Sequence, residues 1–233
     1  MKTASELITF IRSEFALRAD NEKAPVMAAY MKTEMPFYGI RKPDRLPIYK
    51  ELAKRFPPAN IDDYQRNVKA LWQLPHREEK YAAIDYAERF KKFVTSESMP
   101  LFEQMIRSGS WWDFVDPLAI NLAGLVFLNE RKVTSKIIDR WSGDDDFWIR
   151  RAALICHNHH KKETDEEQLF RHCLKLSGET EFFIRKGIGW ALREYSYANP
   201  AAVKQFLFRN RPKLSPLSFR EGAKQLIRSR QMD

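Results

Sequence analysis

Residues 150–155 read Arg150-Arg151-Ala152-Ala153-Leu154-Ile155, and comparable stretches recur at regular intervals. They are EKYAAI at 79–84, VDPLAI at 115–120 and RKGIGW at 185–190, separated by steps of 36, 35 and 35 residues. A period near 35 residues with two helices per unit predicts an α-solenoid of stacked helix pairs. The unit is shorter than a typical HEAT or armadillo repeat and lacks the tetratricopeptide signature, so we describe it as HEAT-like.

The second position of each stretch carries a basic residue in three of the four repeats and an acidic residue in the other. It is occupied in turn by Lys80, Asp116, Arg151 and Lys186. A base recurring once per unit would form a stripe along one face of a solenoid, and on the concave side such a stripe suits a phosphate backbone. Asp116 breaks the pattern, either because a solvated position varies there or because the acid has a chemical role.

The rest of the chain repeats the helical period of 3.6 residues, and we find no convincing alternating strand. The expected helices span residues 5–17, 25–32, 43–56, 61–72, 77–91, 97–107, the tryptophan stretch to 127, 132–141, 146–157, 165–176, 182–195, 200–209 and 216–228. Ser5 is expected to cap the first of them. The sequence thus predicts an all-α superhelix: one α-solenoid domain over residues 1–233, built of HEAT-like antiparallel helix pairs with a concave basic groove.

Composition agrees with a folded, basic protein. The chain has 233 residues, 44% of them hydrophobic, and only 8 glycines, which disfavours a turn-rich all-β fold. Lys and Arg total 40 against 31 acids, a net charge of +9. This balance fits a polyanionic partner such as nucleic acid, although basic surfaces also arise for solubility.

Compartment signals are few. The two cysteines, Cys156 and Cys173, lie in helical segments, which favours buried thiols in a reducing compartment over a disulfide framework. The N-terminus lacks the apolar region of a signal peptide, and no run approaches 18 apolar residues. We therefore expect a cytoplasmic monomer that has no membrane partner and associates with the nucleoid when bound to DNA.

The stretch Ser110-Trp111-Trp112-Asp113-Phe114-Val115-Asp116 holds the candidate chemistry. On a helix Trp112 shares a face with Asp116, and Trp190 lies one turn after Lys186. Tryptophan is more often a core residue, and Trp72, Trp111, Trp141 and Trp148 fit that interpretation. An acid between aromatic faces in a basic groove nevertheless suits hydrolysis of an N-glycosidic bond, since the sugar passes through an oxocarbenium-like state that a carboxylate and indole faces stabilise.

Five segments carry a resemblance over almost the whole chain. In order they are MAAYMK at 27–32, FYGI at 37–40, SWWDFVD at 110–116, WIRRAA at 148–153 and IGWALREY at 188–195. With these segments the chain resembles the AlkD family of alkylpurine DNA glycosylases, which are HEAT-like repeat proteins. The resemblance implies excision of cationic N3- or N7-alkylated purines from duplex DNA, without flipping the base into a pocket.

The resemblance also implies roles for individual residues. The catalytic aspartate of the family matches Asp116, and its two lesion-flanking tryptophans match Trp112 and Trp190. A groove arginine that contacts DNA matches Arg151, and a tyrosine lining the site matches Tyr30. We further expect phosphate contacts from Arg150, Lys186, Arg41, Lys42 and Arg45.

One departure and several alternatives remain. Where the family pattern resembles Pro-x-Arg-Arg, this chain reads Pro43-Asp44-Arg45-Leu46, which puts in doubt a contact opposite the lesion. The histidines near Cys156 (His157, His159 and His160) lack a second cluster with zinc spacing, so we expect no metal and no cofactor. The basic residues of 209–213 and 220–230 either hold duplex backbone or are solvated surface. The alternative function is a non-catalytic HEAT-like module that binds DNA or serves as a protein scaffold.

Overall fold

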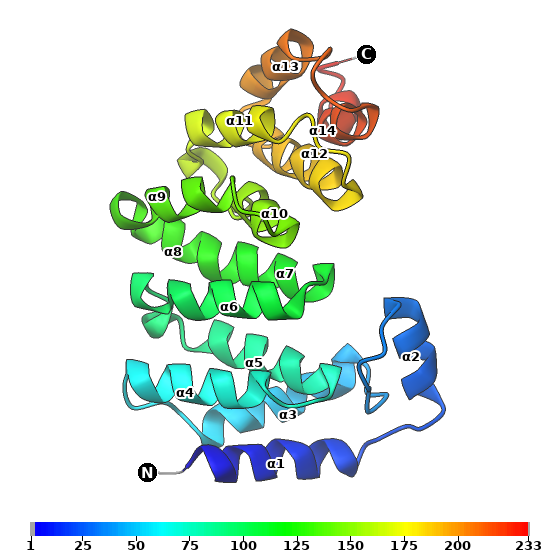
Figure 1. Cartoon of the computed structure of the whole chain (residues 1–233), viewed down its shortest axis with the longest axis vertical. Coiled ribbons are helices and arrows are strands. Elements are labelled where there is room, and N and C mark those ends of the chain that lie inside the picture. Colours follow the sequence, from blue (N-terminus) through cyan, green and yellow to red (C-terminus); the bar gives the residue numbers. More distant parts are fainter. Residues whose placement is uncertain (1–2, 233) are drawn as a thin grey trace. The chain divides into compact units, whose positions relative to one another are not determined.

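The computed structural model describes residues 3–232, which are helical and contain no β-strand (Figure 1). The predicted all-α class is confirmed, and the helix pairs fit the predicted HEAT-like solenoid; the concave basic groove stays a prediction. Its internal contacts separate two compact units, which we call the N-terminal unit (residues 1–94) and the C-terminal unit (residues 95–233). The single domain over 1–233 stays a prediction.

The N-terminal unit contains five helices among its described residues. They are α1 (Ala4–Ala16), α2 (Lys23–Met31), α3 (Lys42–Arg55), α4 (Ile61–Trp72) and α5 (Arg77–Arg89), followed by the short 3₁₀ turn η1 (Lys91–Phe93). Helix α1 is capped by Thr3, not by Ser5 as the sequence suggested. Thr3 accepts the Glu6 N–H at 3.2 Å and donates its own N–H to the Glu6 carboxylate at 2.6 Å. This reciprocal capping box satisfies two N–H groups, whereas a cap at Ser5 would satisfy one.

The C-terminal unit continues the succession of helices. It contains η2 (Ser96–Ser98), α6 (Met99–Gly109), α7 (Trp112–Pro117), η3 (Leu118–Ala123), α8 (Gly124–Asn129), α9 (Arg131–Trp141), α10 (Phe147–Ile155), η4 (Lys161–Glu163), α11 (Glu166–Lys175), α12 (Phe182–Ser196), α13 (Pro200–Arg209) and α14 (Pro216–Arg228). The segments α7, η3 and α8 follow one another without a break, and η3 is π-helical. Pro117 has no N–H to donate, and the widened turn begins directly after its ring.

Within the C-terminal unit, hydrogen bonds between neighbouring repeats follow the predicted period. Arg151 donates to Asp116 over a separation of 35 residues, and Arg107 donates to Asp144 over 37. Gln168 donates to the Ser135 carbonyl over 33. Side chains one repeat apart are therefore direct neighbours, as stacked helix pairs require.

The core contains three of the four tryptophans that the sequence assigned to it, whereas Trp111 is only partly buried. Trp72, Trp141 and Trp148 are buried, and both cysteines are buried free thiols. Burial raises the pKa of each thiol far above its ordinary value, because a thiolate would be poorly solvated there. The expectation of inert structural cysteines is consistent with this environment.

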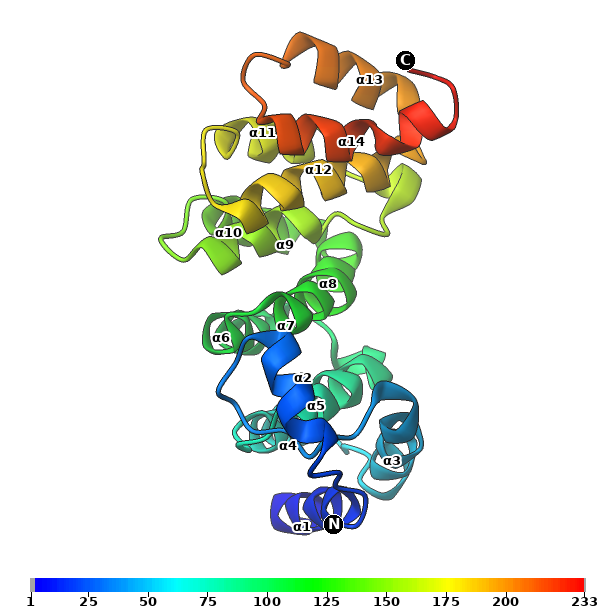
Figure 2. The ribbon, with the colours of Figure 1, turned by 90° about the vertical axis from the view of Figure 1, so that its right-hand side faces the viewer.

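Helices α12 and α14 lie side by side in Figure 2, and a glycine permits their close approach. A Cβ atom at Gly189 would stand 2.4 Å from the Cβ of Glu221 and 2.9 Å from the Ser218 carbonyl oxygen. Both distances are shorter than van der Waals contact, and one of the atoms belongs to the backbone. The two helices would have to separate to admit even one methyl group.

Gly189→Ala is therefore expected to destabilise the protein by about 2 kcal/mol. Overpacking costs about 1–3 kcal/mol, and the upper end applies here because the added Cβ would clash with a Cβ and with a backbone oxygen; the better helix propensity of alanine recovers about 1 kcal/mol. The urea midpoint measures the change. Gly178→Ala is the matched control, because nothing lies within 4 Å of a Cβ there. Equal midpoints for the two variants would contradict the close-approach interpretation.

Candidate functional site

Asp116 lies near the end of α7, immediately before Pro117 and the π-helical turn. Helix α7 begins at Trp112, so the tryptophan and the aspartate are four residues apart on one short helix. That spacing places both side chains on the same face, as the sequence predicted.

The Asp116 carboxylate is held by a two-pronged ion pair. Nε of Arg151 donates to Oδ1 at 2.8 Å, and Nη2 donates to Oδ2 at 2.9 Å. The Arg151 side chain is almost fully buried, while the Asp116 side chain retains 15% exposure. Parallel paired bonds of this kind fix the plane of the carboxylate as well as its position.

Arg151 is itself held by α12. Its Nη1 donates to the Phe183 carbonyl at 2.7 Å, and its guanidinium carbon lies 5.8 Å from the centre of the Trp190 ring. Gly187 leaves room for it, since a Cβ there would come within 3.3 Å of Nη1. The guanidinium thus connects Asp116 on α7 with Trp190 on α12, two repeat units later.

Two opposing effects set the proton affinity of Asp116. Burial raises the pKa of its carboxyl above the ordinary value of 3.8, and the hydrogen bonds and charge of Arg151 offset part of that rise. The neighbouring Asp113 adds a smaller upward contribution. The arrangement is a poorly hydrated carboxylate that depends on one arginine for its charge.

The tryptophans differ in their surroundings. Trp112 exposes 38% of its surface to solvent, which is unusual for so large an apolar side chain. Trp190 is half-buried and donates its Nε1–H to Glu194 at 3.1 Å. Trp111 packs against Trp148 and Phe183, with ring centres 6.0 and 5.8 Å away, so the sequence's structural interpretation of Trp111 fits its contacts.

The repeat position that suggested a stripe of bases is occupied by ion pairs in the C-terminal unit. Lys186 contacts Glu221 at 2.9 Å, just as Arg151 contacts Asp116. Glu221 lies 35 residues beyond Lys186, so a fifth repeat adds a second acid that the sequence reading missed. Extending the period by one unit would have found it. Lys80, in the N-terminal unit, donates to the Trp72 carbonyl at 2.5 Å.

The other predicted DNA contacts differ in their solvent exposure and in their ion pairing. Arg150 is engaged with Glu179 through bonds of 2.6 and 2.8 Å. In the N-terminal unit Arg41 and Lys42 are exposed at the start of α3, and Tyr30 on α2 is 77% exposed. Arg45 is only 7% exposed, with its guanidinium 4.3 Å from the centre of the Tyr81 ring, an environment poorly suited to a direct phosphate contact. These assignments remain predictions.

The histidine-rich segment is packed into the interior. His157 and His160 are buried, and burial lowers the pKa of both, for His160 to about 4. In residues 3–232 no three His, Cys, Asp or Glu side chains are grouped as a metal site. None of the helices in that range combines the length and apolarity needed to cross a membrane.

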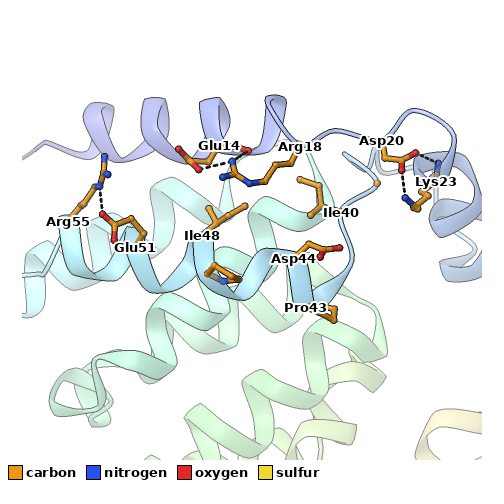
Figure 3. A pocket seen from close by; sticks show the side chains of 12 residues that line it. Glu14, Arg18, Asp20, Lys23, Ile40, Pro43, Asp44, Ile48, Glu51 and Arg55 are labelled. Carbon is orange, nitrogen blue, oxygen red and sulfur yellow. Dashed lines mark hydrogen bonds and ion pairs between the residues drawn. The ribbon is translucent and has the colours of Figure 1, made fainter.

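A groove of the N-terminal unit lies elsewhere, along α1 and α3 (Figure 3). It has a volume of about 710 Å³, and the charged side chains along it pair with one another: Glu14 with Arg18, Asp20 with Lys23 and Glu51 with Arg55. Tyr30 does not line it. The groove therefore lacks the residues that the sequence singled out for chemistry.

Comparison with known proteins places these features in a family. The family model described as DNA alkylation repair enzyme matches residues 11–226. The solved structure of a predicted DNA alkylation repair enzyme from Enterococcus faecalis is 32% identical, covering 89% of this chain and 96% of its own, with a TM-score of 0.82. A search of curated proteins found no significant match. On the extent of the family match, the chain belongs to the DNA alkylation repair enzyme family.

Proposed function

We propose that this protein is a monofunctional DNA glycosylase for cationic N3- and N7-alkylated purines in duplex DNA. The observation that carries the proposal is the Asp116 carboxylate, which Arg151 holds by two hydrogen bonds while 15% of the aspartate side chain stays accessible. A fixed, poorly hydrated anion is what a cationic transition state requires. Membership of the DNA alkylation repair family supports a role in repair of alkylation damage.

The reaction breaks the bond between C1′ of the deoxyribose and the purine nitrogen. The bonding electron pair goes to the purine, which leaves as a neutral base because alkylation had made it cationic. Positive charge develops on the sugar, where Asp116 stabilises it, and the same carboxylate orients a water by accepting its hydrogen bond. The water oxygen bonds to C1′, its proton passes to solvent, and an abasic site remains.

Such a leaving group needs no general acid and no pocket that reads the base. The enzyme can therefore act without flipping the nucleotide, unlike glycosylases that extrude their target. In this proposal Trp112 and Trp190 flank the deoxyribose of the lesion and attract its developing charge through their ring faces. Arg151 holds Asp116 in place and favours its ionised form.

Simple hydrolysis is proposed, without cleavage of the strand. An amine nucleophile would form a Schiff base with the sugar, but Lys186 at the equivalent repeat position is paired with Glu221 at 2.9 Å. Phosphate contacts are assigned to Lys186, Arg150, Arg41 and Lys42, with Tyr30 as a further DNA contact. Arg45 and Arg151 are left out of this set because both side chains are buried. The protein works as a monomer and without a metal or cofactor in this scheme.

The test is release of 7-methylguanine from methylated duplex DNA under single-turnover conditions, measured by chromatography of the free base. The expected result is free base together with strands that break only after alkali treatment, which marks abasic sites. Binding of duplex DNA without any release would instead support the non-catalytic DNA-binding module. Release with immediate strand breakage would overturn the monofunctional assignment.

A further inference from the structure

Helix α2 is attached to the N-terminal unit mainly through the segments at its two ends. Its only buried residue is Met31, whereas Val26 and Tyr30 are largely exposed. Figure 1 shows α2 standing away from the bundle of α1, α3, α4 and α5. A helix with so little apolar surface buried gains little orientation from its own packing.

The two ends of the α2 excursion, residues 20–39, meet at one junction. The Asp20 N–H donates to the Tyr38 carbonyl at 2.8 Å, and the Asp20 carboxylate accepts the Lys23 N–H at 2.9 Å at the start of the helix. Gly39 has a φ of +84°, and a Cβ there would lie 2.2 Å from the Asp20 carbonyl oxygen. The backbone segments that lead into and out of α2 are thus in direct contact.

A buried carboxylate from α5 holds this junction. Glu78 is fully buried and accepts three consecutive backbone N–H groups, from Tyr38 at 3.0 Å, Gly39 at 3.0 Å and Ile40 at 3.1 Å. Hydrogen bonds to an ionised acceptor are roughly twice as strong as neutral ones.

The residues on either side of Glu78 bind the same segment, which leads from α2 to α3. Glu79 accepts the Tyr38 hydroxyl at 3.0 Å, and the Arg77 N–H donates to the Pro36 carbonyl at 2.9 Å. Three successive buried charged residues at the start of α5 therefore bind one segment, residues 36–40.

We propose that Glu78 is a positioning residue for DNA binding: its carboxylate fixes the Asp20–Gly39 junction and thereby sets the orientation of α2 and of Tyr30. The inference rests on the proposed function in one respect, namely that α2 contacts DNA through Tyr30. Glu78 itself touches neither substrate nor solvent and acts only through the backbone of 38–40.

Glu78→Gln tests the proposal, because an amide keeps the shape but turns an N–H₂ group toward backbone donors. Amide hydrogen exchange of the free protein is expected to accelerate in residues 20–40 and to stay unchanged in α4. Binding of a methylated duplex, followed by fluorescence anisotropy, is expected to weaken about tenfold. In a Tyr30→Ala background the same substitution is expected to weaken binding less than twofold, because the helix it positions has lost its contact.

Tyr38→Phe is the matched control, since it removes the hydroxyl bond to Glu79 and keeps all three backbone bonds to Glu78. It should leave binding at the wild-type level and accelerate exchange in residues 20–40 less than Glu78→Gln does. If Glu78→Gln does not fold, Glu78→Asp replaces it, with a smaller change of the same pattern expected. Faster exchange throughout residues 3–94, or equal losses of binding with and without Tyr30, would overturn the proposal. Failure of the wild-type protein to release base would overturn only the proposed function, because neither measurement here requires catalysis.

Discussion

Asp116→Asn is expected to lower the single-turnover rate of 7-methylguanine release by a factor of 10² to 10³ or more. Asparagine is nearly isosteric and can still accept a hydrogen bond from Arg151, but it carries no charge to oppose the developing sugar cation. Loss of one preorganised electrostatic contact costs about 2.7–4 kcal/mol of transition-state stabilisation, which corresponds to that range of rates. Affinity for undamaged duplex should change little, because the sugar is uncharged in the ground state.

The substitution also breaks a buried ion pair, so stability must be measured beside activity. Arg151 would keep its bond to the Phe183 carbonyl but lose its counter-charge, which is expected to lower the free energy of unfolding by roughly 3 kcal/mol. Assays belong well below the melting temperature of the variant. Asp113→Asn is the matched control, since it removes a charge from the first turn of the same helix. Base release at the wild-type rate by Asp116→Asn would remove the aspartate from the mechanism.

The pH dependence of the wild-type rate offers an independent check on the same carboxylate. Burial raises the pKa of Asp116, and only the ionised form can stabilise the sugar cation. Activity should therefore be present at neutral pH and decline as the pH falls through that raised pKa, starting above the value of 3.8 expected of an exposed aspartate. Loss of activity following 3.8 itself would indicate a solvated carboxylate.

The sequence predicted the helices and their period well because both depend on local patterns. The helices Ile61–Trp72, Pro200–Arg209 and Pro216–Arg228 agree with expectation at both ends. The π-helical turn after Pro117 was missed, since a proline inside an amphipathic pattern signals a disturbance without saying how the backbone accommodates it. The location of Asp116 one turn after Trp112 followed from spacing alone.

The sequence could not predict which charged side chains form ion pairs or hydrogen bonds with one another. A period predicts which side chains lie at equivalent positions, but not whether neighbouring repeats pair them. The ion pairs of Asp116 with Arg151 and of Lys186 with Glu221 therefore emerged only from the structure. Likewise Glu78 begins a polar helix turn and would be assigned to the surface by composition, because its partners are backbone groups 38–40 residues earlier in the chain.

Glu221→Gln is expected to lower the free energy of unfolding at pH 7 by about 3 kcal/mol. The Glu221 side chain is 4% exposed and is contacted by Lys186 at 2.9 Å, Arg193 at 2.9 Å and Lys224 at 2.5 Å. Burial alone would raise the pKa of this carboxyl, but Lys224 and Lys186 outweigh it and lower the pKa from 4.5 to about 2. Glutamine resembles the protonated acid, so the difference between 4.5 and about 2 gives the expected loss.

The sign of this effect fixes its pH window. A carboxyl whose pKa is lower in the folded state stabilises the protein fully above its unfolded pKa of about 4.5, and this contribution disappears as the pH falls to about 2. The gap between wild-type and Glu221→Gln in urea unfolding should therefore be constant from pH 7 to 5 and close progressively below that. Other carboxyls, such as Asp144 with a pKa near 2, titrate equally in both proteins and cancel in the comparison. Glu167→Gln, at a 94% exposed side chain, should track the wild-type throughout. A gap that persists unchanged at pH 2 would mean that glutamine disturbs packing against Gly189 and that the three cations contribute little to stability.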